Sequence, residues 1–332
     1  MENPENSKES LQFDNRIDLE ELKSAVVAIK TQLSKVIVGQ ENFIELLIVN
    51  LLANGHVLIE GVPGIAKTIT AKLFAKAIKT NFSRIQFTPD LMPSDVLGTS
   101  IFNLKTSEFE FKKGPIFSNV ILIDEINRAP AKTQSALFEV MEERQITIDG
   151  NKFTMDSPFV VLATQNPLEQ EGTYALPEAQ LDRFLFKIKV DYPNLEEEIL
   201  ILKSHDQRKL NLPLDEVEPV LNIESLKKFK SQVQEILIED KLFTYIAQLI
   251  EKTRNHPHLY LGASPRASIA IMNASKAFAA INGRDFVTPD DIKKTLNPVL
   301  RHRIILSPER EMEGMTPENV IDMISKSVEV PR

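Results

Sequence analysis

The 332-residue chain contains no cysteine and no tryptophan. The absence of cysteine excludes disulfide bonds, thiolate zinc sites and a cysteine nucleophile. A long apolar run is also missing, because the greasiest stretch, residues 43–59, is interrupted by Glu45, Asn50, Asn54 and His56. That stretch is too short and too polar to span a bilayer. The first residues lack the basic-then-apolar order of a signal peptide, so we expect a cytoplasmic protein without membrane insertion.

Basic residues are also fewer than acidic ones. The chain has 39 Lys and Arg residues against 47 Asp and Glu residues, which gives a net charge of −8. A globally acidic protein is a poor passive binder of nucleic acid, although a local basic channel is compatible with that balance. Only four tyrosines are present, and basic and aromatic residues do not interleave. The composition therefore argues against a nucleic-acid partner.

The pattern along the chain predicts three segments. Residues 1–16 are polar and charged, which is typical of a flexible N-terminal arm. In residues 17–192, short apolar runs alternate with helical stretches, which predicts an α/β domain with a parallel sheet. Residues 193–332 repeat apolar positions every three or four residues, which predicts a smaller all-α domain. The predicted strands are 57–60, 85–87, 120–124, 159–164 and 184–190, with inserted hairpins around 101–111 and 146–155.

A glycine-containing loop follows the first predicted strand and precedes a helical run. Its sequence is Gly61-Val62-Pro63-Gly64-Ile65-Ala66-Lys67-Thr68. Such a loop can point backbone N–H groups at phosphates, with Lys67 on the β- and γ-phosphates and the Thr68 hydroxyl on Mg²⁺. Ala66 stands where the strict pattern has glycine, a change without cost if residue 66 has right-handed helical angles. The alternative is an ordinary strand-to-helix turn with a surface lysine.

Two further predicted strands end in polar side chains. Asp124 and Glu125 close an apolar strand and would reach the sheet edge where α/β proteins bind ligands. There Asp124 would hold Mg²⁺, and Glu125 would orient and deprotonate the attacking water. Asn166 ends the next strand, where its amide could bind the γ-phosphate or that water. The alternatives are a solvated acidic pair at a helix start and a plain Asn-Pro turn.

Together these motifs, in this order, resemble an AAA+ ATPase of the MoxR family. The segments that carry the resemblance are Gly61–Thr68 as Walker A, Ile121–Glu125 as Walker B continuing to Gln134, Ala163–Pro167 as sensor 1, Leu176–Phe184 as the arginine-finger segment and Gly262–Arg266 as sensor 2. The resemblance implies a three-layer αβα P-loop domain followed by a small helical lid. It implies ATP and Mg²⁺ as ligands, with Gly39 and Gln40 near adenine. The hairpin around 101–111 resembles the helix-2 insert of the clade that also contains magnesium chelatase and MCM helicases.

The resemblance also assigns two arginines. Arg183 is the expected finger, and in this fold it would act on the neighbouring subunit, which implies a ring, a hexamer in relatives. Arg128 and Arg144 compete for that role, but each is expected to form a surface salt bridge because Glu142 and Glu143 are near. Arg266 follows the predicted helix cap Ser264, where the helix dipole disfavours a cation, so it is expected to contact γ-phosphate as sensor 2, within its own subunit or across a junction. The alternative is a solvated arginine.

Three functions fit these residues. The first is an ATP-hydrolysing chaperone that remodels or activates a separate client complex. In MoxR relatives the partner often carries a von Willebrand factor A domain. The second is a magnesium-chelatase-like or DNA-translocating motor. The third is a scaffold that binds ATP and barely hydrolyses it, against which the intact Glu125, Asn166 and Arg183 argue.

Overall fold

The computed structural model describes residues 16–62, 64–105, 107–166, 174, 176–208 and 212–331. The predicted N-terminal arm, apart from Arg16, and Pro63 of the predicted phosphate loop lie outside the described residues.

The central sheet contains the five predicted strands, all parallel, in the order β2-β5-β8-β1-β9. Their bounds are β1 Val57–Glu60, β2 Phe82–Gln86, β5 Val120–Asp124, β8 Val160–Gln165 and β9 Phe186–Lys189. Strand β2 begins at Phe82, three residues before the expected start at Ile85. It is an edge strand, so polar Ser83 and Arg84 can take part in backbone pairing while their side chains remain partly or fully accessible.

Successive residues of these strands pack into two different cores. Val57 and Ile59 belong to one cluster of buried side chains, whereas Leu58 between them belongs to the other. Because side chains of a strand alternate between the faces of the sheet, both faces must be covered. The first face is covered by α1 Glu20–Ser34, α2 Glu41–Leu52 and α3 Lys67–Ala77, and the second by α4 Pro93–Leu97 and α5 Ala131–Glu143. Helix, sheet and helix form the three predicted layers.

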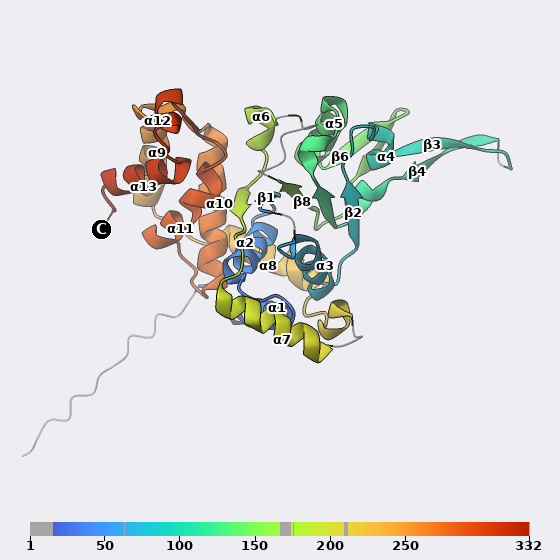
Figure 1. Ribbon diagram of the computed structural model, residues 1–332, viewed down its shortest axis with the longest axis horizontal. Coiled ribbons are helices and arrows are strands. Elements are labelled where there is room, and N and C mark those ends of the chain that lie inside the picture. The colour runs from blue at the N-terminus through green and yellow to red at the C-terminus, as the bar shows by residue number, and fades with distance from the viewer. Residues whose placement is uncertain are drawn as a thin grey trace, which may run out of the picture.

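The chain after β9 is largely helical (Figure 1). Its elements are α7 Leu195–Arg208, α8 Ile223–Glu235, α9 Asp240–Arg254, α10 Pro265–Ile281, α11 Pro289–Leu300, α12 Pro308–Met312 and α13 Pro317–Ser327, with a small ribbon of β10 Leu259–Leu261 and β11 Ile305–Leu306. The predicted caps are present: the Ser264 hydroxyl accepts from the Arg266 N–H, and Thr288 with Asp291 forms a capping box.

The helical segment shares a core with the first face of the sheet. Helix α10 packs against both α1 and α2, and one cluster of buried side chains runs through them. A boundary between residues 192 and 193 stays a prediction, since the apolar packing is continuous across the two segments. None of the helices in the described part of the chain has the length and apolar character that a membrane span requires.

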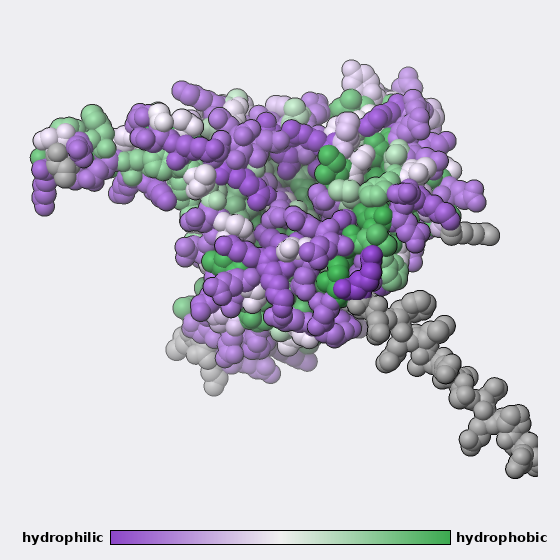
Figure 2. Space-filling view, turned by 180° about the vertical axis from the view of Figure 1, so that it is seen from behind, coloured by the Kyte–Doolittle hydropathy of each residue, from purple (hydrophilic) through white to green (hydrophobic). Residues whose placement is uncertain are grey.

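Both predicted hairpins are formed. One consists of β3 Gly98–Asn103 and β4 Glu108–Lys113, and the other of β6 Gln145–Ile148 and β7 Asn151–Thr154. The β3–β4 hairpin projects far from the body of the molecule (Figure 1), and apolar surface lies at its far end (Figure 2). The exposed apolar side chains there are Ile101, Phe102, Leu104 and Phe109.

Candidate functional site

The loop between β1 and α3 has the backbone of a tight phosphate-binding turn. A Cβ on Gly61 would lie 2.7 Å from the carbonyl oxygen of Val190, so only glycine allows this approach. Gly64 has a φ of +89°, and a Cβ there would meet nothing within 4 Å. The positive φ therefore favours glycine for backbone reasons alone, because a side chain at this position would have room. The described residues Gly61, Val62, Gly64, Ile65 and Ala66 thus connect the strand to the first turn of α3.

The expectation for Ala66 was wrong. Its φ and ψ are 62° and 15°, which is the left-handed region rather than the right-handed helical one. A non-glycine residue there costs about 1–2 kcal/mol because its Cβ crowds the following carbonyl oxygen. The loop therefore keeps a strained alanine at the N-cap of α3, immediately before Lys67.

Lys67 lies inside the loop. Its Nζ donates to the Gly61 carbonyl oxygen at 2.5 Å. Burial lowers the pKa of the Lys67 ammonium, while the charges of Asp124 and Glu125 act in the opposite direction. The ammonium of Lys67 therefore interacts electrostatically with both carboxylates. Thr68 is the next residue, in the first turn of α3.

The acidic pair lies at the end of the buried strand β5, as predicted. Asp124 is 8% exposed. Its Oδ2 accepts from Arg84 Nε at 2.6 Å and its Oδ1 from the Thr164 hydroxyl at 3.3 Å. A carboxylate oxygen of Asp124 and the hydroxyl oxygen of Thr68 are donors of the kind that Mg²⁺ prefers, so their chemistry suits the predicted metal.

Glu125 is held by three contacts. Its backbone has a φ of +57° and its N–H donates to the Thr164 hydroxyl at 3.0 Å. Its Oε2 accepts from Gln86 Nε2 at 2.9 Å and lies 2.9 Å from Arg128 Nε. One oxygen of the carboxylate, Oε2, is thereby engaged within its own chain.

Sequence reasoning missed Arg84, Gln86 and Thr164. The last residue of β2, Gln86, lies opposite Asp124 in the register, and this alignment becomes visible only when the strand order is known. Polar residues at positions 84 and 86 of a strand were the only available signal. Asn166 is buried directly after β8, which lies between β5 and β1 in the sheet, so the predicted sensor residue follows a strand adjacent to both motifs.

A pocket of about 390 Å³ opens beside the loop. The pocket is lined from both predicted domains, by residues that include Val38, Gly39, Gln40, Ile65, Ala66, Ile69, Tyr192, Glu198, Ile201 and Arg208. Gln40 Nε2 donates to the Ile65 carbonyl oxygen at 2.9 Å, which ties the predicted adenine segment to the phosphate loop. The size and the apolar walls of this pocket suit a nucleoside.

Arg183 and Arg266 lie at the opposite edge of the sheet. Leu185 N donates to the His56 carbonyl oxygen, so the start of β9 is level with the start of β1. Gly61 follows the other end of β1, five residues and about 16 Å away. Both arginines instead approach Glu142: Arg266 forms hydrogen bonds of 2.8 and 3.1 Å, and Arg183 Nε lies 3.7 Å away.

A buried network ties the two arginine segments together. The Asp182 carboxylate accepts from the Ser264 hydroxyl at 2.7 Å and from Arg303 Nε at 2.7 Å. Arg303 is 8% exposed and also donates to the Phe184 and Leu185 carbonyl oxygens. The residue before Arg183 and the cap before Arg266 are thus parts of one hydrogen-bonded cluster.

Of the two competing arginines, Arg128 forms a salt bridge but with a different acid than expected, and Arg144 contacts a backbone carbonyl oxygen instead. Arg128 pairs with Glu125, the third residue before it, rather than with Glu142 or Glu143. Arg144 Nη2 donates to the Asn54 carbonyl oxygen at 2.5 Å, and burial lowers the pKa of its guanidinium. The partner of Arg128 is local, whereas Arg144 reaches a carbonyl oxygen 90 residues away that only the fold brings near.

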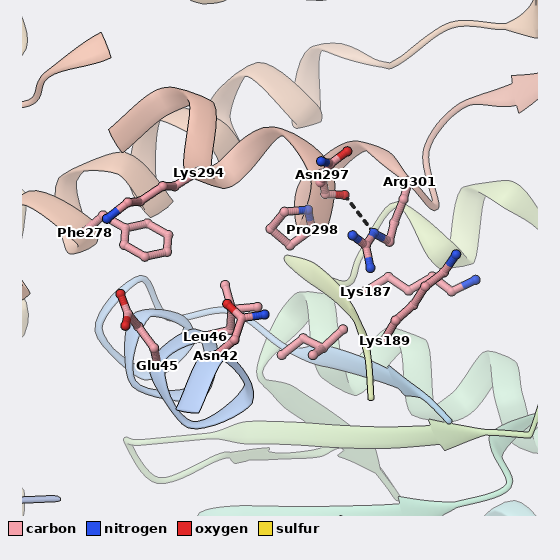
Figure 3. Close-up of a pocket in the computed structure, with 11 residues that line it drawn as sticks. Asn42, Glu45, Leu46, Lys187, Lys189, Phe278, Lys294, Asn297, Pro298 and Arg301 are labelled. Atoms are coloured by element: carbon pink, nitrogen blue, oxygen red, sulfur yellow. Dashed lines mark hydrogen bonds between the residues drawn. The ribbon is translucent and has the colours of Figure 1, made fainter. Parts of the chain in front are cut away.

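A second cavity, of about 440 Å³, lies between α2, β9 and α11 (Figure 3). Two of its three lysines have acidic partners, since Lys187 lies 2.5 Å from Glu60 and Lys189 lies 2.7 Å from Glu318, and Lys294 lies over the ring of Phe278. It contains none of the predicted site residues. Across the described ranges, no group of three or more His, Cys, Asp or Glu side chains is arranged to hold a metal ion.

Comparisons with known proteins agree with this geometry. Residues 56–186 match the family described as ATPase family associated with various cellular activities (AAA), and residues 251–324 match the AAA lid domain. The chain is 48% identical to the uncharacterised protein YeaC of Bacillus subtilis over 90% of this chain and 92% of that protein. It is 43% identical to the chaperone MoxR1 of Mycobacterium tuberculosis, over 91% and 81% of the two chains. A crystal structure assigned as an ATPase from Cytophaga hutchinsonii superposes with a TM-score of 0.87 at 41% identity, covering 94% of this chain and 97% of that one.

Proposed function

This chain belongs to the MoxR family of AAA+ ATPases, and on that premise we propose that it hydrolyses ATP at the junctions of a homo-oligomeric ring, a hexamer as in relatives, to remodel or activate a separate client protein. The observation that carries the proposal is that the predicted site residues lie at opposite ends of the parallel strands. We call the end where the strands finish the carboxyl edge and the end where they begin the amino edge. Lys67, Asp124 and Glu125 gather at the carboxyl edge, and Arg183 and Arg266 gather at the amino edge.

The carboxyl edge would bind and activate the substrate. Backbone N–H groups of the loop and the first turn of α3 would hold the phosphates, and Lys67 would leave the Gly61 carbonyl oxygen for a phosphate oxygen. A Mg²⁺ ion held by Thr68 and Asp124 would neutralise negative charge on the phosphate oxygens. Asn166 would orient the attacking water.

Glu125 would act as the general base. Its carboxylate accepts a proton from the water, whose oxygen forms a bond to the γ-phosphorus while the bond to the ADP oxygen breaks. Gln86 and Arg128 hold Oε2 of this carboxylate in the free chain, so they would orient it while its other oxygen, Oε1, would take the proton.

The amino edge would serve the neighbouring subunit. Its arginines are too far from the loop of the same chain, since β1 separates them by about 16 Å. A guanidinium brought to a neighbour's γ-phosphate would stabilise the charge that develops in the transition state. This requirement for two subunits is the reason for proposing a ring.

A protein client fits the projecting hairpin better than a nucleic acid does. Its far end exposes the apolar side chains of Phe102, Leu104 and Phe109 beside Lys105 and Glu108, a mixture that suits a protein surface, whereas a phosphate backbone is bound mainly by several cations. We propose that the client is a separate protein, for which the family resemblance suggests a von Willebrand factor A domain.

The test is a Glu125→Gln variant. It should retain ATP binding and ring assembly while turnover falls by about 10²–10⁴-fold, the usual contribution of a general base. Glu108→Gln, a substitution of a hairpin acid, serves as the matched control and should hydrolyse ATP like the wild type. Turnover of Glu125→Gln equal to wild type would refute the assigned base, and stimulation of the wild-type ATPase by single-stranded DNA would favour a translocating motor.

A further inference from the structure

Glu142 contacts both arginines of the amino edge with one carboxylate. It lies in the last turn of α5, and its two oxygens accept from the two terminal nitrogens of Arg266 at 2.8 and 3.1 Å. Its Oε2 also lies 3.7 Å from Arg183 Nε. Glu142 therefore separates two guanidinium groups that would otherwise repel each other across the same small space.

One nitrogen of the Arg183 guanidinium, Nε, lacks a hydrogen-bond acceptor among the described residues. Arg183 Nη1 donates to the Phe138 carbonyl oxygen, which fixes the guanidinium. Its Nε is buried and has no hydrogen-bond partner among the described residues, since 3.7 Å to Glu142 is too long. The two oxygens of the Glu142 carboxylate accept the hydrogen bonds of Arg266 and leave Arg183 Nε without an acceptor. A phosphoryl group has three oxygens and could accept hydrogen bonds from both arginines.

We propose that Glu142 is an intramolecular stand-in for the γ-phosphate of the neighbouring subunit's ATP, and that this phosphate must displace it before Arg183 and Arg266 close the junction. The inference rests on the proposed function, in which both arginines act across a junction. It assigns to Glu142 the role of a positioning residue that keeps the two arginines side by side until the exchange.

Displacement of Glu142 by a γ-phosphate would make two subunits associate more readily when ATP, rather than ADP, is bound between them. A γ-phosphate offers more negative charge and one more acceptor than a carboxylate, so it can outcompete Glu142 for both arginines. ADP brings no such group to the junction, and Glu142 then keeps Arg266. Without Glu142, the arginines would be free to approach any anion on the neighbour, including the phosphates of ADP.

The contact is weak enough to be exchanged. The side chains of Arg183, Arg266 and Glu142 are 28%, 50% and 35% exposed, respectively. Ion pairs at this exposure are screened by water, so displacing one costs little compared with the contacts that a junction gains. The pair can therefore bias assembly without preventing it.

The experiment compares ring assembly of Glu142→Gln and wild type, each with ADP and with ATP, by analytical ultracentrifugation over a range of protein concentrations. Both proteins carry Glu125→Gln so that ATP persists. We expect Glu142→Gln to assemble with ADP at a protein concentration about two- to five-fold lower than wild type, the range expected for a partly exposed ion pair. With ATP, the shift should be smaller, because wild type already exchanges the contact.

Controls separate this role from a structural one. Glu143→Gln makes the same charge change at the next position of α5, where no arginine contact is seen among the described residues, and should assemble like wild type. Adding Arg266→Ala to Glu142→Gln should abolish the gain with ADP. Glu142→Asp, whose shorter side chain keeps the charge, should show a smaller shift in the same direction.

Assembly of Glu142→Gln that is unchanged with ADP, or weakened equally with both nucleotides, would overturn the inference while leaving the proposed function intact. If instead the protein carrying only Glu125→Gln fails to assemble with ATP, the proposed ring fails, and the role of Glu142 fails with it.

Discussion

The carboxyl and amino edges of the sheet are built in different ways. The carboxyl edge holds its phosphate loop in one unbroken segment, residues 61–68, and shapes it with backbone angles such as the left-handed ones of Ala66. The amino edge joins side chains from distant positions, with Glu142, Arg183 and Arg266 meeting only after folding. The comparison indicates that phosphate binding is a local property of this chain, whereas the ability to complete another subunit's site depends on tertiary structure.

Removing the finger should have the largest effect. Arg183→Ala is expected to lower ATP turnover by about 10³-fold or more while ATP affinity stays near wild type, because the guanidinium acts on transition-state charge rather than on binding. Steady-state hydrolysis and calorimetry measure the two quantities. The surface variant Arg310→Ala should change neither, and an Arg183→Ala protein with normal turnover would remove the amino edge from the chemistry.

Removing the lysine of the loop should affect binding instead. Lys67→Ala deletes a charge-assisted contact to phosphate, which corresponds to about 10- to 100-fold weaker ATP binding by calorimetry. Lys72→Ala, one turn later in α3, is the matched control and should bind ATP normally. Equal affinity of the two variants would contradict the placement of the nucleotide at this edge.

Lowering the pH should destabilise the folded protein at the amino edge, which contains the buried imidazoles of His56 and His302. Burial, with a smaller effect of Arg144, lowers the pKa of His56 to about 3, and burial lowers the pKa of His302 well below its ordinary value. Below about pH 6.5 the unfolded chain binds protons that the folded chain excludes, so stability is full above that pH and falls as pH decreases. Each histidine contributes a loss of about 1.4 kcal/mol per pH unit.

Urea unfolding at pH 7.5, 6.5 and 5.5 measures this slope. His205→Gln, in the exposed part of α7, should leave it unchanged. A free energy of unfolding that is constant from pH 7.5 to 5.5 would show that neither buried histidine resists protonation.

Relieving the backbone strain of the carboxyl edge should have the smallest effect. Ala66→Gly is expected to raise the free energy of unfolding by about 0.5–1 kcal/mol, because the relief of left-handed strain exceeds the extra flexibility of glycine in the unfolded chain. The same change at Ala25, within the right-handed helix α1, should lower it by about 1 kcal/mol. Destabilisation at both positions would indicate that Ala66 is unstrained.

The sequence was most informative where structure is local. The five strands, both hairpins and the caps at Ser264 and Thr288 were predicted because alternation, turn residues and capping side chains act within a few residues. The left-handed conformation of Ala66 was not predicted, because alanine ordinarily favours right-handed angles and nothing in the local sequence marks the exception. The partners Arg84 and Gln86 of the acidic pair, and Glu142 of the arginines, were missed because strand order and helix packing bring them together.

The most direct test of the account mixes two inactive proteins, Arg183→Ala and Lys67→Ala. In a mixed ring, some junctions pair an intact phosphate loop from the first protein with an intact finger from the second. The account predicts that the mixture recovers part of the ATPase activity that each protein lacks alone. A mixture that forms joint rings and remains as inactive as its components would contradict a site shared between subunits.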